Sequence, residues 1–288
     1  MFDKLVIAGV GLIGGSVALA ARRGKLARRI VGIGRADGSI NSAIALGVID
    51  AAEAPEQAAN ADLIVLAMPV GQMPGVMAEL RPHLGAKTLI TDAGSTKGDV
   101  VAAAREHLGD ALPRFIPGHP IAGAEKSGVA AATAELFDDK NVVLTPLAEN
   151  AAADVNAVAD FWRACGAKVS EMPVEAHDKI FAAISHLPHV LAFALVGEIA
   201  RRPDADQLFA FAAGGFRDFT RIAGSSPEMW RDICLANRPA LLAEMDAYAA
   251  RLQQMRELID TQDGAALADF FEHARAARNA WANARGQQ

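Results

Sequence analysis

The feature that most constrains this chain is a glycine pattern that follows a short apolar run near its N-terminus. Residues 5–8 are continuously apolar, as expected for a strand buried on both faces, and residues 17–24 form a helix pattern that ends at a glycine. Between them, Gly9, Gly11 and Gly14 match G-x-G-x-x-G. The first glycine allows a tight turn, the second lets the backbone approach a pyrophosphate, and the third lets the helix pack closely. We therefore expect a dinucleotide-binding strand–turn–helix unit.

The same unit indicates which nicotinamide dinucleotide binds. The helix N-terminus should place Leu12 and Ile13 beside the phosphates. An NAD-preferring site carries an acidic residue after the second strand, for the ribose 2′-hydroxyl. Here Gly34 and Arg35 stand at that point, and an arginine favours a 2′-phosphate. We expect NADP rather than NAD, with Arg35 as its ligand, although Asp37 lies close by and a plain surface role for Arg35 stays open.

Strand-like and helix-like segments alternate through the first part of the chain. This alternation predicts one mostly parallel, doubly wound, Rossmann-like sheet in a nucleotide-binding domain of residues 1–172. Because strand carboxyl ends line the ligand crevice, we expect Ala67 and Pro69 to contact the cofactor. The expected strands are residues 5–8, 30–33, 63–67, 88–91, 141–145 and 168–171.

From about residue 173 the strand pattern disappears, which predicts an all-helical domain of residues 173–288. Pro188 should kink or break the first of its helices. Trp230 is expected to be a core aromatic residue. The apolar helix faces indicate a partner surface, and we expect a homodimer formed through this domain. The expected helices are residues 177–201, 208–211, 216–221, 237–259 and 264–283, with a break at Gly214 and Gly215.

Charge and cysteine content exclude several protein classes. The formal net charge of −6 and the lack of a long basic run argue against nucleic-acid binding. Cys165 and Cys234 are the only cysteines, so neither a disulfide framework nor a cysteine-rich zinc site is expected, and we predict no metal. The sequence shows no signal peptide and, by our interpretation, no stretch long enough to cross a bilayer. We expect a cytoplasmic protein.

A turn and a loop at a strand end in the first domain carry polar side chains that could do chemistry. His119 stands among prolines and glycines in residues 117–123, which predicts a shaped turn that holds one imidazole. Imidazole suits proton transfer near neutral pH, although for His119 taken alone an ordinary turn histidine at the surface is the favoured interpretation. Ser95, in the loop of residues 92–98, could hold a substrate oxygen or cap the helix that follows.

The helical half carries two pairs of candidate substrate-binding residues. His186 and His189 are three positions apart, so they share a helix face; packed core histidines are the alternative. No H-E-x-x-H pattern accompanies them. Arg217 and Arg221 also share a face and would suit a substrate with two acidic groups. A salt bridge to Asp218 remains the alternative for at least one of them.

Five segments in this order resemble the prephenate/arogenate dehydrogenase family of tyrosine biosynthesis. The glycine pattern alone is generic, but the ordered set is specific to that family. The resemblance implies an oxidative decarboxylation, in which NAD(P)⁺ takes a hydride from ring carbon 4 of prephenate and the ring carboxylate leaves as CO₂. The product would be 4-hydroxyphenylpyruvate, or tyrosine when arogenate is the substrate. The segments are residues 9–16, 92–98, 118–123, 185–189 and 214–223.

The resemblance also implies roles for individual residues. His119 would accept the proton of the 4-hydroxyl group, and Ser95 would help to hold that group. His189 and Arg221 would bind the substrate, with Arg221 on a carboxylate. The family's charged residues around the site entrance correspond to Glu125, Arg217 and Asp218.

Two other functions fit parts of the sequence. A 3-hydroxyacid or 6-phosphogluconate-type dehydrogenase shares the domain order, but it would need a catalytic lysine in the helical half, where only Lys179 stands. A nucleotide-sensing binding protein would have no need for His119, His189 and Arg221 together. Because the sequence ends at Gln288, no appended regulatory domain is expected. The choice between prephenate and arogenate stays open.

Overall fold

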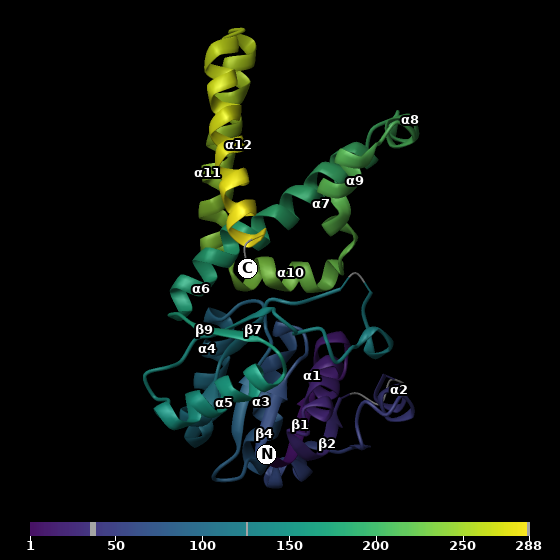
Figure 1. Cartoon of the computed structure of the whole chain (residues 1–288), viewed down its shortest axis with the longest axis vertical. Coiled ribbons are helices and arrows are strands. Elements are labelled where there is room, and N and C mark those ends of the chain that lie inside the picture. The colour runs from purple at the N-terminus through teal and green to yellow at the C-terminus, as the bar shows by residue number, and fades with distance from the viewer. Residues whose placement is uncertain (35–38, 125, 287–288) are drawn as a thin grey trace. The chain divides into compact units, whose positions relative to one another are not determined.

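The computed structural model describes residues 1–34, 39–124 and 126–286 (Figure 1). The chain divides into two compact units, Met1–Ala240 and Leu241–Gln288. Arg35, Asp37 and Glu125, which the sequence analysis singled out, lie outside the described residues.

A six-stranded parallel sheet forms the centre of the first unit, in the order β3-β2-β1-β4-β5-β6. The order reverses between β1 and β4, which is where doubly wound sheets bind their ligands. The Rossmann-like fold predicted from the sequence is confirmed. The strands are β1 (Phe2–Ala8), β2 (Ala27–Ile33), β3 (Ala51–Ala52), β4 (Leu63–Leu66), β5 (Leu89–Asp92) and β6 (Phe115–Ile116).

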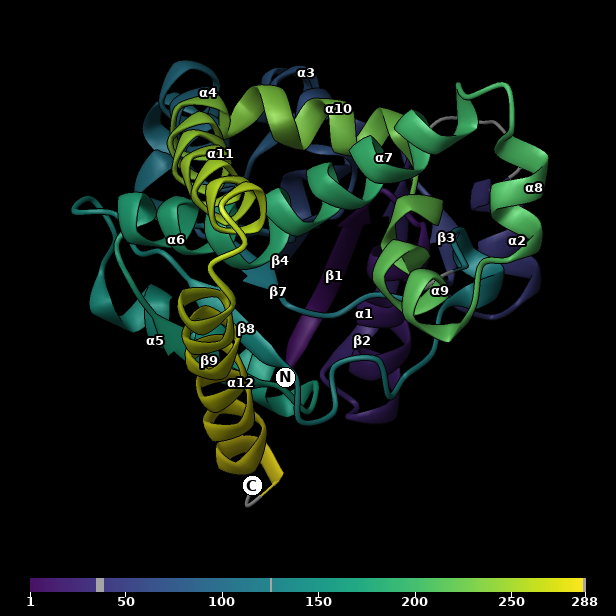
Figure 2. The same cartoon turned by 90° about the horizontal axis from the view of Figure 1, so that it is seen from above.

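Helices cover both faces of this sheet, and Figure 2 shows α1 and α4 on opposite sides of β1 and β4. Leu5 and Ile7 point to one core and Val6 and Ala8 to the other, since successive strand side chains face opposite ways. The first core contains side chains of α1 (Leu12–Arg23), α2 (Ser39–Ala45) and α5 (Ala152–Ala164). The second contains side chains of α3 (Met73–Leu80) and α4 (Gly98–His107).

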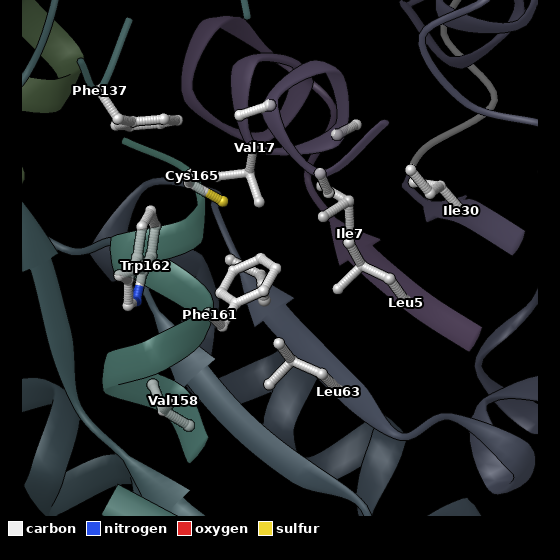
Figure 3. Close-up of a cluster of buried hydrophobic side chains, with 14 of the residues drawn as sticks. Leu5, Ile7, Val17, Ile30, Leu63, Phe137, Val158, Phe161, Trp162 and Cys165 are labelled. Carbon is white, nitrogen blue, oxygen red and sulfur yellow. The ribbon is translucent and has the colours of Figure 1, made fainter. Parts of the chain in front are cut away.

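Aromatic rings of α5 fill the first core (Figure 3). The Trp162 ring packs edge to face against Phe161 and Phe137, with centroids 5.7 and 5.4 Å apart. Cys165 lies among these side chains, and its burial raises the pKa of the thiol to about 12. Such a thiol stays protonated and acts as an apolar packing group rather than a nucleophile.

A second sheet corrects the prediction of one sheet for the whole domain. Its strands are β7 (Gly118–Pro120), β8 (Asn141–Leu144) and β9 (Lys168–Glu171), with β7 antiparallel and β9 parallel to β8. Pro117 explains the separation, because it offers no N–H to extend β6 along β5. The prediction of a turn over residues 117–123 is therefore partly wrong, because residues 118–120 form a strand. His119 lies on the edge strand β7, opposite Val143.

One long helix opens the helical part, built from α6 (Val174–Phe181), a π-helical segment (Ala182–His186) and α7 (Leu187–Ala200). Pro188 does not break it. The backbone widens just before the proline, as helices do when an N–H donor is missing. By length and composition alone this helix could cross a membrane, contrary to our sequence interpretation. Core helices of soluble proteins pass the same test.

The remaining helices differ from the prediction at two places. Gly214 and Gly215 begin a helix instead of breaking one. The helix Pro227–Ala236 was not predicted; it starts at Ser226, whose hydroxyl accepts the Met229 N–H, and it carries the buried Trp230. These helices are α8 (Ala205–Ala210), α9 (Gly214–Thr220), α10 (Pro227–Ala236), α11 (Arg238–Asp260) and α12 (Gly264–Gly286). Short 3₁₀ segments include Val70–Gln72, Gly109–Arg114 and Arg221–Gly224.

Candidate active site

The glycine turn after β1 has the geometry of a dinucleotide cradle. Gly9 has a φ of +91°, and a Cβ there would lie 2.9 Å from the carbonyl carbon of Ala67. A Cβ on Gly14 would lie 2.0 Å from the Gly9 oxygen, so both positions require glycine. A Cβ on Gly11 would meet nothing within 4 Å, which leaves its backbone open to a ligand. These residues fit a bound pyrophosphate.

The other expected cofactor residues border this turn. Leu12 and Ile13 form the first turn of α1, half-buried, and no side chain caps that helix at Gly11. Its first N–H groups are thus available to phosphate oxygens. Ala67 and Pro69 follow β4 at the sheet's switch point, and Ala67 donates its N–H to Ala8.

A buried ion pair fixes the loop after β5. Asp92 and Lys97 are fully buried and bonded to each other. Asp92 also accepts hydrogen bonds from the N–H groups of Gly94 and Gly118, at 2.8 and 3.0 Å. Lys97 donates to the Gly118 oxygen at 2.8 Å. Because Gly118 precedes His119, this pair sets the position of the candidate base relative to the strand end.

His119 belongs to a chain of hydrogen-bonded groups that the sequence analysis did not anticipate. Its Nδ1 lies 2.8 Å from Nε2 of His177, and Nδ1 of His177 lies 2.8 Å from Oδ1 of Asp178. The Asp178 carboxylate also accepts the N–H groups of Lys97 and Gly98, at 2.9 and 2.8 Å. Asp178 on α6 therefore caps the start of α4, a role that the sequence had left open for Ser95.

The surroundings of His119 favour its neutral form. Burial lowers the pKa of His119 well below its ordinary value, and the nearby His177, Lys97 and His186 lower it further. The Phe181 ring packs edge to face on the imidazole, 4.8 Å away between centroids. A neutral imidazole at pH 7 carries one free lone pair, so it can accept a proton.

His186 lies in the π-helical segment and is nearly fully buried. Its Nδ1 lies 3.2 Å from Nδ2 of Asn237, and the same amide donates to the Asp178 carbonyl at 2.7 Å. Burial lowers the pKa of His186 to about 4, while a backbone hydrogen bond at Ser95 acts in the opposite direction. His186 thus connects the long helix to the Ser95 loop and to α10.

His189 lies one turn further along the helix and has different contacts. Its ring stacks on Trp230, with centroids 3.6 Å apart and planes 21° apart, and its Nδ1 donates to the Ser185 carbonyl at 2.9 Å. Burial lowers the pKa of His189, and the charge of Arg221 lowers it further. The structure therefore brings His189 and Arg221 together.

Arg217 has a different environment. Its side chain is 82% exposed and lies 3.7 Å from the Asp218 carboxylate, which is the salt bridge left open by the sequence. The structure does not bring Arg217 into the buried histidine cluster. Helix α10 packs against the Val70–Gln72 segment, which follows β4 (Figure 1).

Sequence reasoning missed His177, Asp178, Asn237 and the Asp92–Lys97 pair. For Asp92 and Lys97 a signal existed, since two opposite charges stand in a small-residue loop at a parallel strand's carboxyl end.

Among residues 1–34, 39–124 and 126–286, no cluster of three or more His, Cys, Asp or Glu side chains is arranged to hold a metal.

Comparison with known proteins bears on the whole chain. The family model for "Prephenate dehydrogenase, nucleotide-binding domain" matches residues 17–171, and that for "Prephenate dehydrogenase, dimerization domain" matches residues 173–273. A cyclohexadienyl dehydrogenase of Zymomonas mobilis is 36% identical, with 96% of each chain covered. A prephenate dehydrogenase of Bacillus subtilis is 39% identical over 96% of this chain and 75% of the relative.

Solved structures agree with these matches. The prephenate dehydrogenase of Aquifex aeolicus, in complex with hydroxyphenyl propionate and NAD⁺, is 35% identical to this chain. The two superpose with a TM-score of 0.90 over 96% of this chain and 98% of the other.

Proposed function

The chain belongs to the prephenate dehydrogenase family, and on that premise we propose that it oxidatively decarboxylates prephenate, arogenate or both with a nicotinamide cofactor. The products are 4-hydroxyphenylpyruvate from prephenate and tyrosine from arogenate. The observation that carries the proposal is the buried imidazole of His119 on β7, which burial keeps at a lowered pKa and which Gly118 connects to Asp92 at the carboxyl end of β5.

The chemistry needs a base at one place. Ring carbon 4 of the substrate becomes electron-poor as its hydride leaves, and removal of the hydroxyl proton by His119 stabilises that transition state. A bound nicotinamide would supply the hydride acceptor. The electron pair of the bond to the departing carboxylate then enters the ring, which becomes aromatic as CO₂ leaves. His119 is the group of this chain that takes up the released proton.

The substrate has to be oriented through its polar groups. We assign Arg221 to a carboxylate, because a guanidinium binds carboxylates through two hydrogen bonds. His189 lies beside it, with Nδ1 committed to Ser185 and Nε2 left for the substrate. Ser95 is assigned to the 4-hydroxyl group, His186 to the wall of the site behind the Ser95 loop, and Arg217 to the entrance.

The choice between NAD and NADP depends on the sequence after β2. Gly34 and Arg35 stand where an acidic residue would select NAD, so we propose a preference for NADP. Gly9, Gly11, Gly14, Leu12, Ile13, Ala67 and Pro69 would hold the parts that NAD and NADP share. The relative from A. aeolicus was solved with NAD⁺, so the preference requires a direct test.

We further propose a cytoplasmic homodimer with a domain boundary at residue 172. The two family models meet at residues 171 and 173, and the second is described as a dimerization domain. The long apolar helix Val174–Ala200 lies within that second range, which favours packing against another subunit over crossing a bilayer.

The test is an assay that crosses prephenate and arogenate with NAD⁺ and NADP⁺. We expect reduced cofactor in at least one of the four combinations, and no reduction in any of them would contradict the proposal. In the active combination, His119→Asn should lower kcat by about 10²–10⁴-fold with little change in KM, the usual loss when a general base is removed. His107→Asn, at the end of α4, is the control and should behave like the wild type.

A further inference from the structure

We propose that His177 and Asp178 form a positioning pair that selects which nitrogen of His119 acts as the base and stabilises its charge after proton uptake. This inference rests on the proposed function, and it adds two residues that touch neither substrate nor cofactor. Its basis is the direction of each hydrogen bond between Asp178 and His119.

The direction starts at the Asp178 carboxylate. The backbone N–H groups of Lys97 and Gly98 can only donate, and they bind its two oxygens at 2.9 and 2.8 Å. Both oxygens therefore act as acceptors. The positive N-terminal end of α4 also favours an ionised carboxylate at this place. Because Oδ1 accepts, Nδ1 of His177, 2.8 Å away, must carry the proton that it donates.

The remaining protons follow from this one. A neutral imidazole has one N–H, so Nε2 of His177 is left as an acceptor. Nδ1 of His119, 2.8 Å from it, must then be the donor. The lone pair of His119 is consequently on Nε2, the nitrogen that is not used in the chain and that faces away from His177. Burial lowers the pKa of His177, which supports the neutral form assumed here.

Charges around the pair explain why the carboxylate matters after proton transfer. Lys97 is the nearby cation that opposes a positive charge on His119. Asp92 neutralises Lys97 directly, since the two are paired. Asp99 also lies near Asp178, but burial raises its pKa and it has no bond to His177. Asp178 is thus the anion that hydrogen bonds connect to His119.

Asp178→Asn is the variant that tests this. The amide carries no negative charge, and where its nitrogen replaces Oδ1 it donates to Nδ1 of His177, which turns that ring into a donor at Nε2 and moves the lone pair of His119 onto Nδ1. We expect kcat to fall on the order of 10²–10⁴-fold with KM changed less than about threefold, as when a base is held in the wrong tautomer. Asp99→Asn removes a carboxylate from the first turn of α4, next to Asp178, and should keep kcat within about threefold of the wild type.

Two variants of His177 separate positioning from packing. His177→Gln keeps an oxygen acceptor near the place of Nε2, whereas His177→Leu fills similar space without one. We expect His177→Gln to retain at least about ten times the kcat of His177→Leu, since a charge-assisted hydrogen bond contributes roughly 1.5–3 kcal/mol. Equal kcat values in the two variants would show that only packing matters and would overturn the proposal.

Nitrogen NMR of ¹⁵N-histidine-labelled protein tests the tautomer without turnover. The chain has 7 histidines, and the His119 signals are those missing from His119→Asn. We expect a protonated Nδ1 and an unprotonated Nε2 in the wild type, and the reverse in Asp178→Asn. The reverse pattern in the wild type would overturn the inference. Lack of any dehydrogenase activity would instead overturn the proposed function and leave the NMR result standing.

Discussion

Arg221 carries the clearest single-residue prediction. Its charge lowers the pKa of His189, so a carboxylate bound to Arg221 would lie near the His189 ring. Arg221→Ala should raise KM about 10- to 100-fold, the equivalent of a lost charge-assisted hydrogen bond, and should change kcat much less. Arg202→Ala, an exposed arginine at the end of α7, is the matched control. An unchanged KM in steady-state assays of Arg221→Ala would reject the carboxylate role.

Arg35 is the residue on which the cofactor preference depends. An aspartate there would repel the 2′-phosphate of NADP and accept the 2′-hydroxyl of NAD. Arg35→Asp should therefore lower the ratio of kcat/KM for NADP⁺ to that for NAD⁺ by at least about tenfold. A factor of this size corresponds to the loss of one hydrogen bond between charged groups. Arg28→Asp, on β2 with an exposed side chain, should leave that ratio unchanged. If Arg35→Asp also leaves the ratio unchanged, the proposed preference for NADP is wrong.

His119 shows how far a sequence can identify a single residue. Its neighbours, two prolines and two glycines, mark it as unusual, but the segment predicted as a turn contains the edge strand β7. The partners of its imidazole could not be predicted, because His177 is 58 positions away on a helix whose docking depends on tertiary contacts. No local pattern contains that information.

The loop between β5 and α4 is the element that joins the cofactor half to the candidate base. Lys97→Met should destabilise the protein by about 3–5 kcal/mol, since it leaves the buried Asp92 without its counter-ion. The measurement is denaturant unfolding at equilibrium. The double variant Asp92→Asn with Lys97→Met removes both charges and should recover part of that loss. A single variant as stable as the wild type would show that water reaches this pair.

The elements themselves were predictable to different degrees. Short runs dominated by apolar residues identified β1, β2 and β4, because strands buried on both faces leave that pattern. The separate sheet was not predictable, since strands of 3 and 4 residues look alike whichever sheet they join. Helix α10 was missed although Ser226 and Pro227 form an ordinary N-terminal signal. The π-helical widening before Pro188 is a tertiary accommodation that no propensity describes.

At the scale of the whole molecule, the site consists of parts that each lack a function alone. The Rossmann-like sheet supplies the cofactor cradle and the strand end with Asp92, and the edge strand β7 supplies His119. The long helix supplies the Asp178–His177 pair, His186 and His189. Helix α10 supplies Trp230, and Asn237 follows its end. The order of five motifs predicted this family from the sequence, while the contacts among the motifs required the fold.

The last prediction concerns assembly through the helical part. Along α11, Met245, Leu252 and Ile259 recur every seven residues, and their side chains are exposed by 37%, 48% and 60%. A stripe with this spacing is typical of helices that pack against another helix, and large exposed apolar faces mark subunit contacts.

We expect light scattering to give twice the mass of one chain for the wild type. Leu252→Glu buries a charge in the predicted contact and should shift the protein to the mass of one chain at micromolar concentration. Ala250→Glu adds the same charge two positions away, outside the stripe, and should remain a dimer. A dimeric Leu252→Glu would place the contact between subunits on other helices, and a monomeric wild type would contradict the proposed homodimer.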